Sequence, residues 1–396
     1  MNNTPLLKRM CPAQRTREIT PFIVMEVLER IHGMEAVGID VVHLEIGEPD
    51  SKIPECVKTA TMEGFDCNQT CYTHSLGDIR LRRAIAAYYL KNYGVTIDPE
   101  QILVTSGTSP AMLLLFSTLV DPGDEIIISD PHYSCYPNFI RFAQGVPVTV
   151  PVFEDQGFHY TPREIEASIT DRTKGIMINS PSNPTGIVMP EKRMNEIKEL
   201  AQAYGIPIIS DEIYHGLVYE GRAPSILEFT KDAFVFNGFS KLFAMTGLRL
   251  GYIIAPEAFM RPLQILQQNF FISANSLMQL AGTAALKEAE AVTSTICDTY
   301  DRRRRYMIKR LKEMGLGIAN EPTGAFYVFA NAKRFSEDSY ALALDILDKA
   351  HVGVTPGIAF GANGEGYLRF SYATAMGNLE KGMNRLEQYF RQAVSR

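Results

Sequence analysis

The chain has 396 residues, of which 46% are hydrophobic and 21% are charged, and its formal net charge is -6. This length exceeds the roughly 250–300 residues at which single hydrophobic cores stop growing, so we expect two domains. The acidic balance excludes a broad basic face for nucleic acid, and we interpret the basic run at residues 301–305 as a solvated helix face. A packed, enzyme-sized protein is expected.

The longest apolar run, residues 111–120, is interrupted by Ser117 and Thr118 and is shorter than the roughly 20 residues of a membrane-spanning helix. The N-terminus lacks a charged segment followed by an apolar stretch, so we expect a cytoplasmic protein that does not bind membranes. The six cysteines show no CxxC spacing, and the seven histidines show no HExxH motif. These patterns predict reduced thiols and no metal site.

Short β-rich runs alternate with helical patterns between about residues 100 and 255. The strand-like runs are residues 102–105, 125–129, 147–152, 175–179, 206–210, 233–237 and 248–254. This alternation is typical of βαβ units around a mostly parallel sheet. In such sheets a ligand binds beyond the carboxyl ends of the strands, so the residues that follow these runs are candidate site residues.

The C-terminal third predicts a different organisation. Residues 282–314 have the pattern of one long, charged, amphipathic helix, and residues 325–329 and 367–371 are strand-like. The first 49 residues contain a helical pattern and a strand-like run, which we expect to fold back onto the C-terminal part. The prediction is a large domain of residues 50–285 and a smaller α+β domain of residues 1–49 and 286–396, joined by the long helix.

Lys241 lies in a loop between two strand-like runs, eight residues before Arg249. A loop lysine taken alone is usually a solvated surface charge. The neighbours of Lys241 are apolar or small, which indicates a partly buried amine whose pKa can fall far enough for imine chemistry.

The segment 238–252 resembles the cofactor-lysine motif of class I/II aminotransferases, which are fold-type I pyridoxal-phosphate enzymes. Other motifs of that family occur in the matching order. They are Gly47-Glu48-Pro49-Asp50, Tyr72 with Gly77 and Leu81-Arg82, Ser182-Asn183-Pro184-Thr185-Gly186, Asp211-Glu212-Ile213-Tyr214, and Leu368-Arg369-Phe370-Ser371-Tyr372. Each motif is weak alone, but together they span almost the whole chain.

The resemblance implies an α/β protein of fold-type I, with a mostly parallel seven-stranded sheet between helices in the large domain. It implies pyridoxal 5'-phosphate held as a Schiff base on Lys241. The implied reaction moves an amino group from an L-amino acid to a 2-oxo acid by a ping-pong mechanism. A homodimer with shared sites is also implied, in which Tyr72 reaches the phosphate bound by the neighbouring subunit.

The chemistry of this cofactor requires particular residue types. A carboxylate must keep the pyridine nitrogen protonated, and Asp211 follows a strand-like run at a suitable place, although alone it could equally be a helix N-cap. The resemblance implies that Asn183 and Tyr214 hydrogen-bond the ring hydroxyl oxygen and that Tyr133 stacks on the ring. The implied catalytic residues are Lys241, Asp211 and Tyr214.

The phosphate requires oriented donors and positive charge. A strand-like run meets a helical pattern at residues 106–109, where backbone amides and hydroxyls suit a dianion, although alone this segment could be an N-cap. The residues are Ser106, Gly107, Thr108 and Ser109. Arg249 would add a bidentate guanidinium, and Ser240 is a further candidate because Gly238 stands where the family often has a hydroxyl.

The resemblance assigns the substrate α-carboxylate to Arg369, with Gly47 and Asn183 nearby. Ile19, Phe22 and Ile46 lie in segments that line the side-chain pocket in this family. Ser109 stands where some aspartate-using relatives have a lysine for a second carboxylate. We therefore expect an apolar or aromatic substrate, whereas Arg17 or Arg222 would have to enter the pocket to hold a dicarboxylate.

There are three alternatives to the aminotransferase function. A carbon–sulfur β-lyase of the same fold shares these residues, and a scan of amino donors with pyruvate and ammonia release as the competing readout would separate the two enzymes. A silent, cofactor-binding regulatory protein is disfavoured by the intact Lys241 and by the absence of an appended nucleic-acid-binding segment in this sequence. A nicotinamide dehydrogenase is disfavoured because residues 357–366, although glycine-rich, do not spell GxGxxG.

Overall fold

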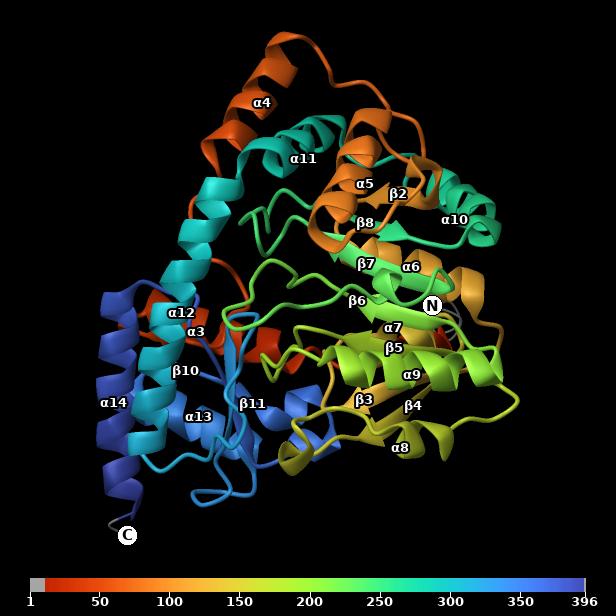
Figure 1. Cartoon of the computed structure of the whole chain (residues 1–396). Coiled ribbons are helices and arrows are strands. Elements are labelled where there is room, and N and C mark those ends of the chain that lie inside the picture. Colours follow the sequence, from red (N-terminus) through yellow and green to blue (C-terminus); the bar gives the residue numbers. More distant parts are fainter. Residues whose placement is uncertain (1–10, 395–396) are drawn as a thin grey trace, which may run out of the picture.

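The computed structural model describes residues 11–394 (Figure 1). Within this range seven strands form one sheet in the order β2-β8-β7-β6-β5-β3-β4. The strands are β2 (Ile102–Thr105), β3 (Glu125–Asp130), β4 (Val146–Pro151), β5 (Thr173–Asn179), β6 (Ile208–Asp211), β7 (Ala233–Gly238) and β8 (Gly251–Ile254). Among these strands only the pairings of β8 with β2 and with β7 are antiparallel, so the predicted mostly parallel seven-stranded sheet is confirmed.

The sheet lies between two helical layers, as the burial of its strands requires. On β2, Ile102 and Val104 join one hydrophobic core with Ile85 of α5 (Ile79–Tyr93), whereas Leu103 joins a second core with Leu115 of α6 (Thr108–Leu119). Successive side chains of a strand point to opposite faces, so a strand that is covered on both faces is apolar throughout. This explains why the strand-like runs contain almost uninterrupted Ile, Leu and Val.

The helices that surround and extend the sheet have the following bounds. They are α2 (Gln14–Arg17), α3 (Ile23–Ala36), α4 (Glu55–Asp66), α5 (Ile79–Tyr93), α6 (Thr108–Leu119), α7 (Tyr136–Phe142), α8 (Pro162–Glu166), α9 (Glu191–Tyr204), α10 (Glu257–Phe270), α11 (Ser276–Glu288), α12 (Glu290–Glu313), α13 (Ser339–Ala350) and α14 (Met376–Val394). Short 3-10 helices are η1 (Pro99–Gln101), η2 (Glu154–Gln156), η3 (Ile226–Glu228), η4 (Gly357–Phe360) and η5 (Ala362–Gly364). In Figure 1, α12 runs down one side of the molecule beside α14.

Two smaller sheets lie outside the large one. β9 (Tyr327–Asn331), β12 (Tyr367–Ser371) and β11 (Thr355–Pro356) form an antiparallel sheet, and β1 (Val42–His43) pairs parallel with β10 (Val352–Gly353). The β1–β10 pair joins the N-terminal part of the chain to the C-terminal part. We propose on this basis that both termini form the smaller domain, and the boundaries at residues 49 and 285 stay predictions.

The single long helix predicted for residues 282–314 is wrong. The structure has two helices, α11 and α12, that meet at Ala289, whose ψ of 7° is not helical. The backbone N–H of Ala289 still donates to the carbonyl of Ala285, and its own carbonyl accepts from Thr293. The bend occupies one buried alanine, so the apolar periodicity of the sequence continues across it. The sequence pattern therefore gives no sign of the change of direction between α11 and α12 that Figure 1 shows.

The solvated face predicted for residues 301–305 is wrong for Arg304, which is buried, although Arg302 and Arg305 are exposed. The guanidinium of Arg304 donates to Asp301 Oδ1 at 2.8 Å and to the carbonyl of Pro322 at 2.7 Å. Arg304 occupies the helical stripe of Tyr300, Met307 and Leu311, so its stem packs in the core while its charge is paired.

Candidate active site

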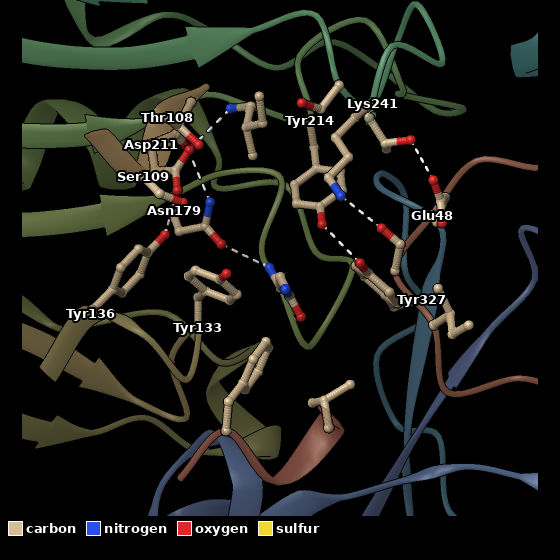
Figure 2. Close-up of a pocket in the computed structure, with 18 of the residues that line it drawn as sticks. Glu48, Thr108, Ser109, Tyr133, Tyr136, Asn179, Asp211, Tyr214, Lys241 and Tyr327 are labelled. Atoms are coloured by element: carbon tan, nitrogen blue, oxygen red, sulfur yellow. Dashed lines mark hydrogen bonds between the residues drawn. The ribbon is translucent and has the colours of Figure 1, made fainter. Parts of the chain in front are cut away.

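A pocket of about 480 Å³ opens where the carboxyl ends of β5 and β6 face the smaller sheets (Figure 2). Most residues that the sequence indicated line it. They are Gly47, Thr108, Ser109, Tyr133, Asn183, Asp211, Tyr214, Ser240, Lys241, Arg249 and Arg369, with Phe22 and Ile46 in the wall. The fold thus brings together side chains that are up to 347 residues apart in the chain, from Phe22 to Arg369.

Asp211 is the last residue of β6 and is buried. Its Oδ2 accepts a hydrogen bond from Tyr136 Oη at 2.6 Å, and its Oδ1 accepts from the backbone N–H of Ile213 at 3.1 Å. Burial raises the pKa of Asp211 to about 6 because a charged carboxylate loses its hydration there. A cationic N–H in the pocket would therefore be strongly favoured beside it.

Asn179 connects Asp211 to the loop that carries Asn183. Asn179 ends β5, and its Nδ2 donates to the carbonyl of Asp211 at 3.0 Å while its Oδ1 accepts from the backbone N–H of Asn183 at 2.7 Å. Figure 2 shows Asn179 beside Asp211, with Tyr136 at the other end of this network. Hydrogen bonds thus fix the polar residues at the carboxyl ends of β5 and β6 relative to one another.

Arg369 lies in the middle of β12 and is buried. Its Nη1 donates to Asn183 Oδ1 at 2.9 Å, and its Nη2 donates to the carbonyl of Glu45 at 2.5 Å and to Thr355 Oγ1 at 3.2 Å. Its Nε has no hydrogen-bond partner among the described residues. A buried donor without a partner is costly, and a carboxylate ligand would satisfy it.

Lys241 follows β7 in a loop whose neighbours Phe239, Leu242 and Met245 are buried. Its Nζ donates to the carbonyl of Gly47 at 2.6 Å (Figure 2). Burial, assisted by the positive charge of Arg369, lowers the pKa of Lys241 to about 8. A useful fraction of this amine is therefore neutral, and nucleophilic, near neutral pH.

An anion-binding corner lies at the start of α6. Thr108 and Ser109 form the first helical turn, whose free N–H groups favour negative charge. Gly107 has φ of +96°, and a Cβ there would overlap the guanidinium of Arg249, so glycine permits the close approach. Ser106 and Gly107 directly precede the helix, but neither is among the residues that line the pocket.

Two tyrosines extend the network on the other side of the pocket. Tyr214 Oη and Tyr327 Oη are 2.8 Å apart, and both side chains are buried. Tyr133 lines the pocket and makes edge-on contacts with Phe22 and Tyr136, at ring-centroid distances of 6.3 Å and 5.3 Å. The pocket therefore has aromatic walls in addition to its charged groups.

Some indicated residues lie elsewhere in the described chain. Tyr72 is 82% exposed and does not line this pocket, so its predicted role in a neighbouring subunit stays a prediction. Ile19 and Arg17 are also outside the lining residues. Arg222 forms ion pairs with Glu191 and Glu228, so it is engaged away from the pocket.

Sequence reasoning missed Tyr136, Asn179, Tyr327 and Glu48, all of which line the pocket. Asn179 had a usable signal, since it ends a strand-like run next to the one that precedes Asp211. Tyr136 and Tyr327 had none, because each looks like an ordinary core aromatic. Glu48 accepts a hydrogen bond from Thr246 Oγ1, and it lies within the family motif of residues 47–50.

Comparison with known proteins identifies the family to which this geometry belongs. The model of the family described as aminotransferase class I and II matches residues 39–386. The chain belongs to this family. It is an aminotransferase, with the α/β fold of the pyridoxal-phosphate-dependent members.

Three relatives illustrate the similarity. The aminotransferase is 40% identical to "(5-formylfuran-3-yl)methyl phosphate transaminase" of Methanocaldococcus jannaschii, over 95% of this chain and 99% of that protein. It is 34% identical to aromatic-amino-acid aminotransferase 2 of Thermococcus litoralis, over 97% and 99% of the two chains. The structure of aspartate aminotransferase from Thermus thermophilus with maleate superposes with a TM-score of 0.92, at 33% identity, over 96% and 99% of the two chains.

Two further observations concern the described residues of this aminotransferase. No helix within residues 11–394 is long and apolar enough to cross a membrane. In the same range, no group of three or more His, Cys, Asp or Glu side chains could hold a metal ion.

Proposed function

We propose that this aminotransferase binds pyridoxal 5'-phosphate on Lys241 and transfers amino groups between an L-amino acid and a 2-oxo acid by a ping-pong reaction. The observation that carries the proposal is the convergence of three groups in one pocket. They are an amine of lowered pKa, a buried carboxylate and a buried guanidinium with an unpartnered N–H.

The donor set fits this cofactor. The start of α6 and Arg249 suit the phosphate, and Asp211 suits the protonated ring nitrogen. Tyr214 and Asn183 would hold the ring oxygen, Tyr133 would contact the ring face, and Lys241 would attach as a Schiff base. The remaining phosphate donors are Ser106, Gly107, Thr108, Ser109 and, from the neighbouring subunit, Tyr72. When bound, the cofactor supplies an electron sink for the electron pair left as the substrate Cα–H bond breaks.

Residues of the chain would also bind the substrate carboxylate and move the substrate proton. Arg369 binds the substrate α-carboxylate through its free N–H, and Asn183 holds the guanidinium in place. Lys241 would act as a neutral base whose Nζ takes up the substrate Cα proton and releases it again within the site. The carbonyl of Gly47 accepts a hydrogen bond from Lys241 Nζ and so orients the amine.

A half-reaction experiment tests the proposal against the carbon–sulfur β-lyase and the silent binding protein. The purified, cofactor-loaded protein is mixed once with an amino acid, and the 2-oxo acid, ammonia and aminated cofactor are measured. We expect one 2-oxo acid per site and a cofactor that carries the amino group, with no free ammonia. Ammonia and pyruvate from a β-substituted amino acid, without amination of the cofactor, would favour the lyase, and no turnover would favour the binding protein.

We further propose an apolar or aromatic amino acid as one substrate. Among the described residues the cations that line the pocket are Lys241, Arg249 and Arg369, and each already has an assigned task. The rest of the wall is largely apolar. It includes Phe22, Val24, Met25, Leu28, Ile46, Met112 and Phe360. Burial there stabilises a bound hydrophobic side chain by about 25 cal/mol per Å² of apolar surface. Desolvation of an unpaired substrate carboxylate there would cost several kcal/mol.

This preference predicts that phenylalanine and leucine exceed aspartate and glutamate in kcat/KM by at least about tenfold in single half-reactions. A Phe22→Ala variant should lose about tenfold with phenylalanine but little with alanine, since only the larger side chain reaches the wall. Phe142→Ala, which truncates an exposed ring outside the pocket, is the control. If aspartate and glutamate both exceed every apolar amino acid by tenfold, the apolar preference is wrong.

We propose that the enzyme is a cytoplasmic homodimer with shared sites. Tyr72 is 82% exposed and does not line the pocket of its own chain, so its side chain is available to a neighbouring subunit. Inactive Lys241→Ala and impaired Tyr72→Ala proteins should complement each other when their subunits exchange. A random mixture contains hybrids with one intact site, so about a quarter of wild-type activity should return. Each protein exchanged with itself is the control. Proven subunit exchange without recovered activity would contradict the shared site.

A further inference from the structure

Tyr327 lies where several parts of the proposed machinery meet. It is the first residue of β9, and only 1% of its surface is exposed. Its hydroxyl lies 2.8 Å from Tyr214 Oη, and its ring centroid lies 4.3 Å from Cζ of Arg369. In Figure 2 the two tyrosine hydroxyls face each other across the side of the pocket that carries Lys241.

The contact between the two hydroxyls has a direction once the cofactor is bound. Burial raises the pKa of both phenols, so each keeps its single proton at neutral pH. If Tyr214 donates its proton to the ring oxygen of the cofactor, it can only accept from Tyr327. Tyr327 Oη is then the donor, and it makes the Tyr214 hydroxyl a better donor in turn.

The ring of Tyr327 has a second task. The guanidinium of Arg369 lies over the Tyr327 ring and over the Phe360 ring, with its Cζ at 4.3 Å and 4.8 Å from their centroids. Such cation–π contacts strengthen when water is excluded, as it is here. Gly47 packs directly against the same residue, since a Cβ on Gly47 would overlap the Tyr327 hydroxyl.

We propose that Tyr327 is a positioning residue that couples the two ends of the site. Its hydroxyl directs the Tyr214 proton toward the ring oxygen of the cofactor, and its ring holds the Arg369 guanidinium that binds the substrate α-carboxylate. The inference rests on the proposed function and adds to it a residue that the sequence motifs do not contain.

The hydroxyl is tested with Tyr327→Phe, using Tyr372→Phe as the matched control. Tyr372 is a buried tyrosine next to β12 whose hydroxyl donates to the carbonyl of Ala325 at 3.3 Å, and it does not line the pocket. The visible absorption of the bound cofactor is titrated with pH. Loss of the donor leaves the negative ring oxygen less stabilised, so the Lys241 nitrogen holds its proton more tightly. The midpoint should rise by about half a pH unit in Tyr327→Phe and stay unchanged in the control.

The ring is tested by comparing Tyr327→Phe with Tyr327→Leu in the binding of phenylpropionate, a carboxylate without an amino group. The Phe variant keeps the ring and should bind nearly as wild type, whereas the Leu variant should bind about tenfold more weakly. Equal midpoints for Tyr327→Phe and Tyr372→Phe, or unchanged affinity in Tyr327→Leu, would overturn the inference. A wild-type protein without a visible cofactor band would overturn the proposed function as well, so the two failures are distinguishable.

Discussion

Replacing Lys241 by alanine should lower the rate of the half-reaction by roughly four orders of magnitude or more, because one change removes both the covalent attachment and the proton carrier. The amine of Lys241 is suited to both tasks. Burial and Arg369 lower its pKa to about 8, and the carbonyl of Gly47 holds its Nζ at 2.6 Å. The rate is measured in single turnover with an excess of one amino acid donor.

Chemical labelling provides the direct measurement for Lys241. Borohydride reduction of the cofactor-loaded wild type, followed by peptide mapping, should place the pyridoxyl group on Lys241. Lys333→Ala serves as the control, because Lys333 is an exposed lysine whose Nζ lies over the Tyr367 ring and outside the pocket. This variant should keep both the label and the rate. A pyridoxyl group on another lysine would refute the assignment.

Replacing Asp211 by asparagine should leave cofactor binding largely intact and lower the half-reaction rate by about a thousandfold. Asparagine has nearly the same shape but no charge, so it cannot hold a proton on the ring nitrogen. The variant then lacks the fixed carboxylate that would stabilise the charge distribution that develops as the Cα–H bond breaks. Hydrogen bonds from Tyr136 Oη and from the Ile213 amide hold the Asp211 carboxylate in place.

A matched control for this variant exists at the end of another strand of the same sheet. Asp130 ends β3, is buried, and accepts a hydrogen bond from the backbone N–H of Asn363 at 3.0 Å, but it does not line the pocket. Asp130→Asn should lower stability without a comparable loss of rate, as followed by thermal unfolding and single turnover. Near wild-type turnover in Asp211→Asn with full cofactor occupancy would remove Asp211 from the mechanism.

Much of the large sheet could be predicted from local patterns. The strand-like runs fall on β2 to β8 within a few residues, because strands covered on both faces must be apolar and lie between helical patterns. The interruption of the helix predicted for residues 282–314 could not be predicted. A bend at one buried alanine, Ala289, leaves the helical period undisturbed on both sides.

The type of chemistry could be predicted from short sequence motifs. Lys241, Asp211, Asn183, Arg249 and Arg369 lie in short motifs, and each motif carries its residue type and its strand-end or loop setting within a few neighbouring positions. Such information is local, so it can be read without knowing where the chain turns. The structure then places all five side chains around one pocket.

Which polar side chains meet in the folded chain could be seen only in the tertiary structure. Tyr136 meets Asp211 across 75 residues, Tyr327 meets Tyr214 across 113, and Arg304 reaches Glu220 across 84. Each contact depends on how distant strands and helices are placed and in what register they pair. Local periodicity contains no information on that placement, because a buried tyrosine or arginine has the same period whether its polar end meets a partner or not.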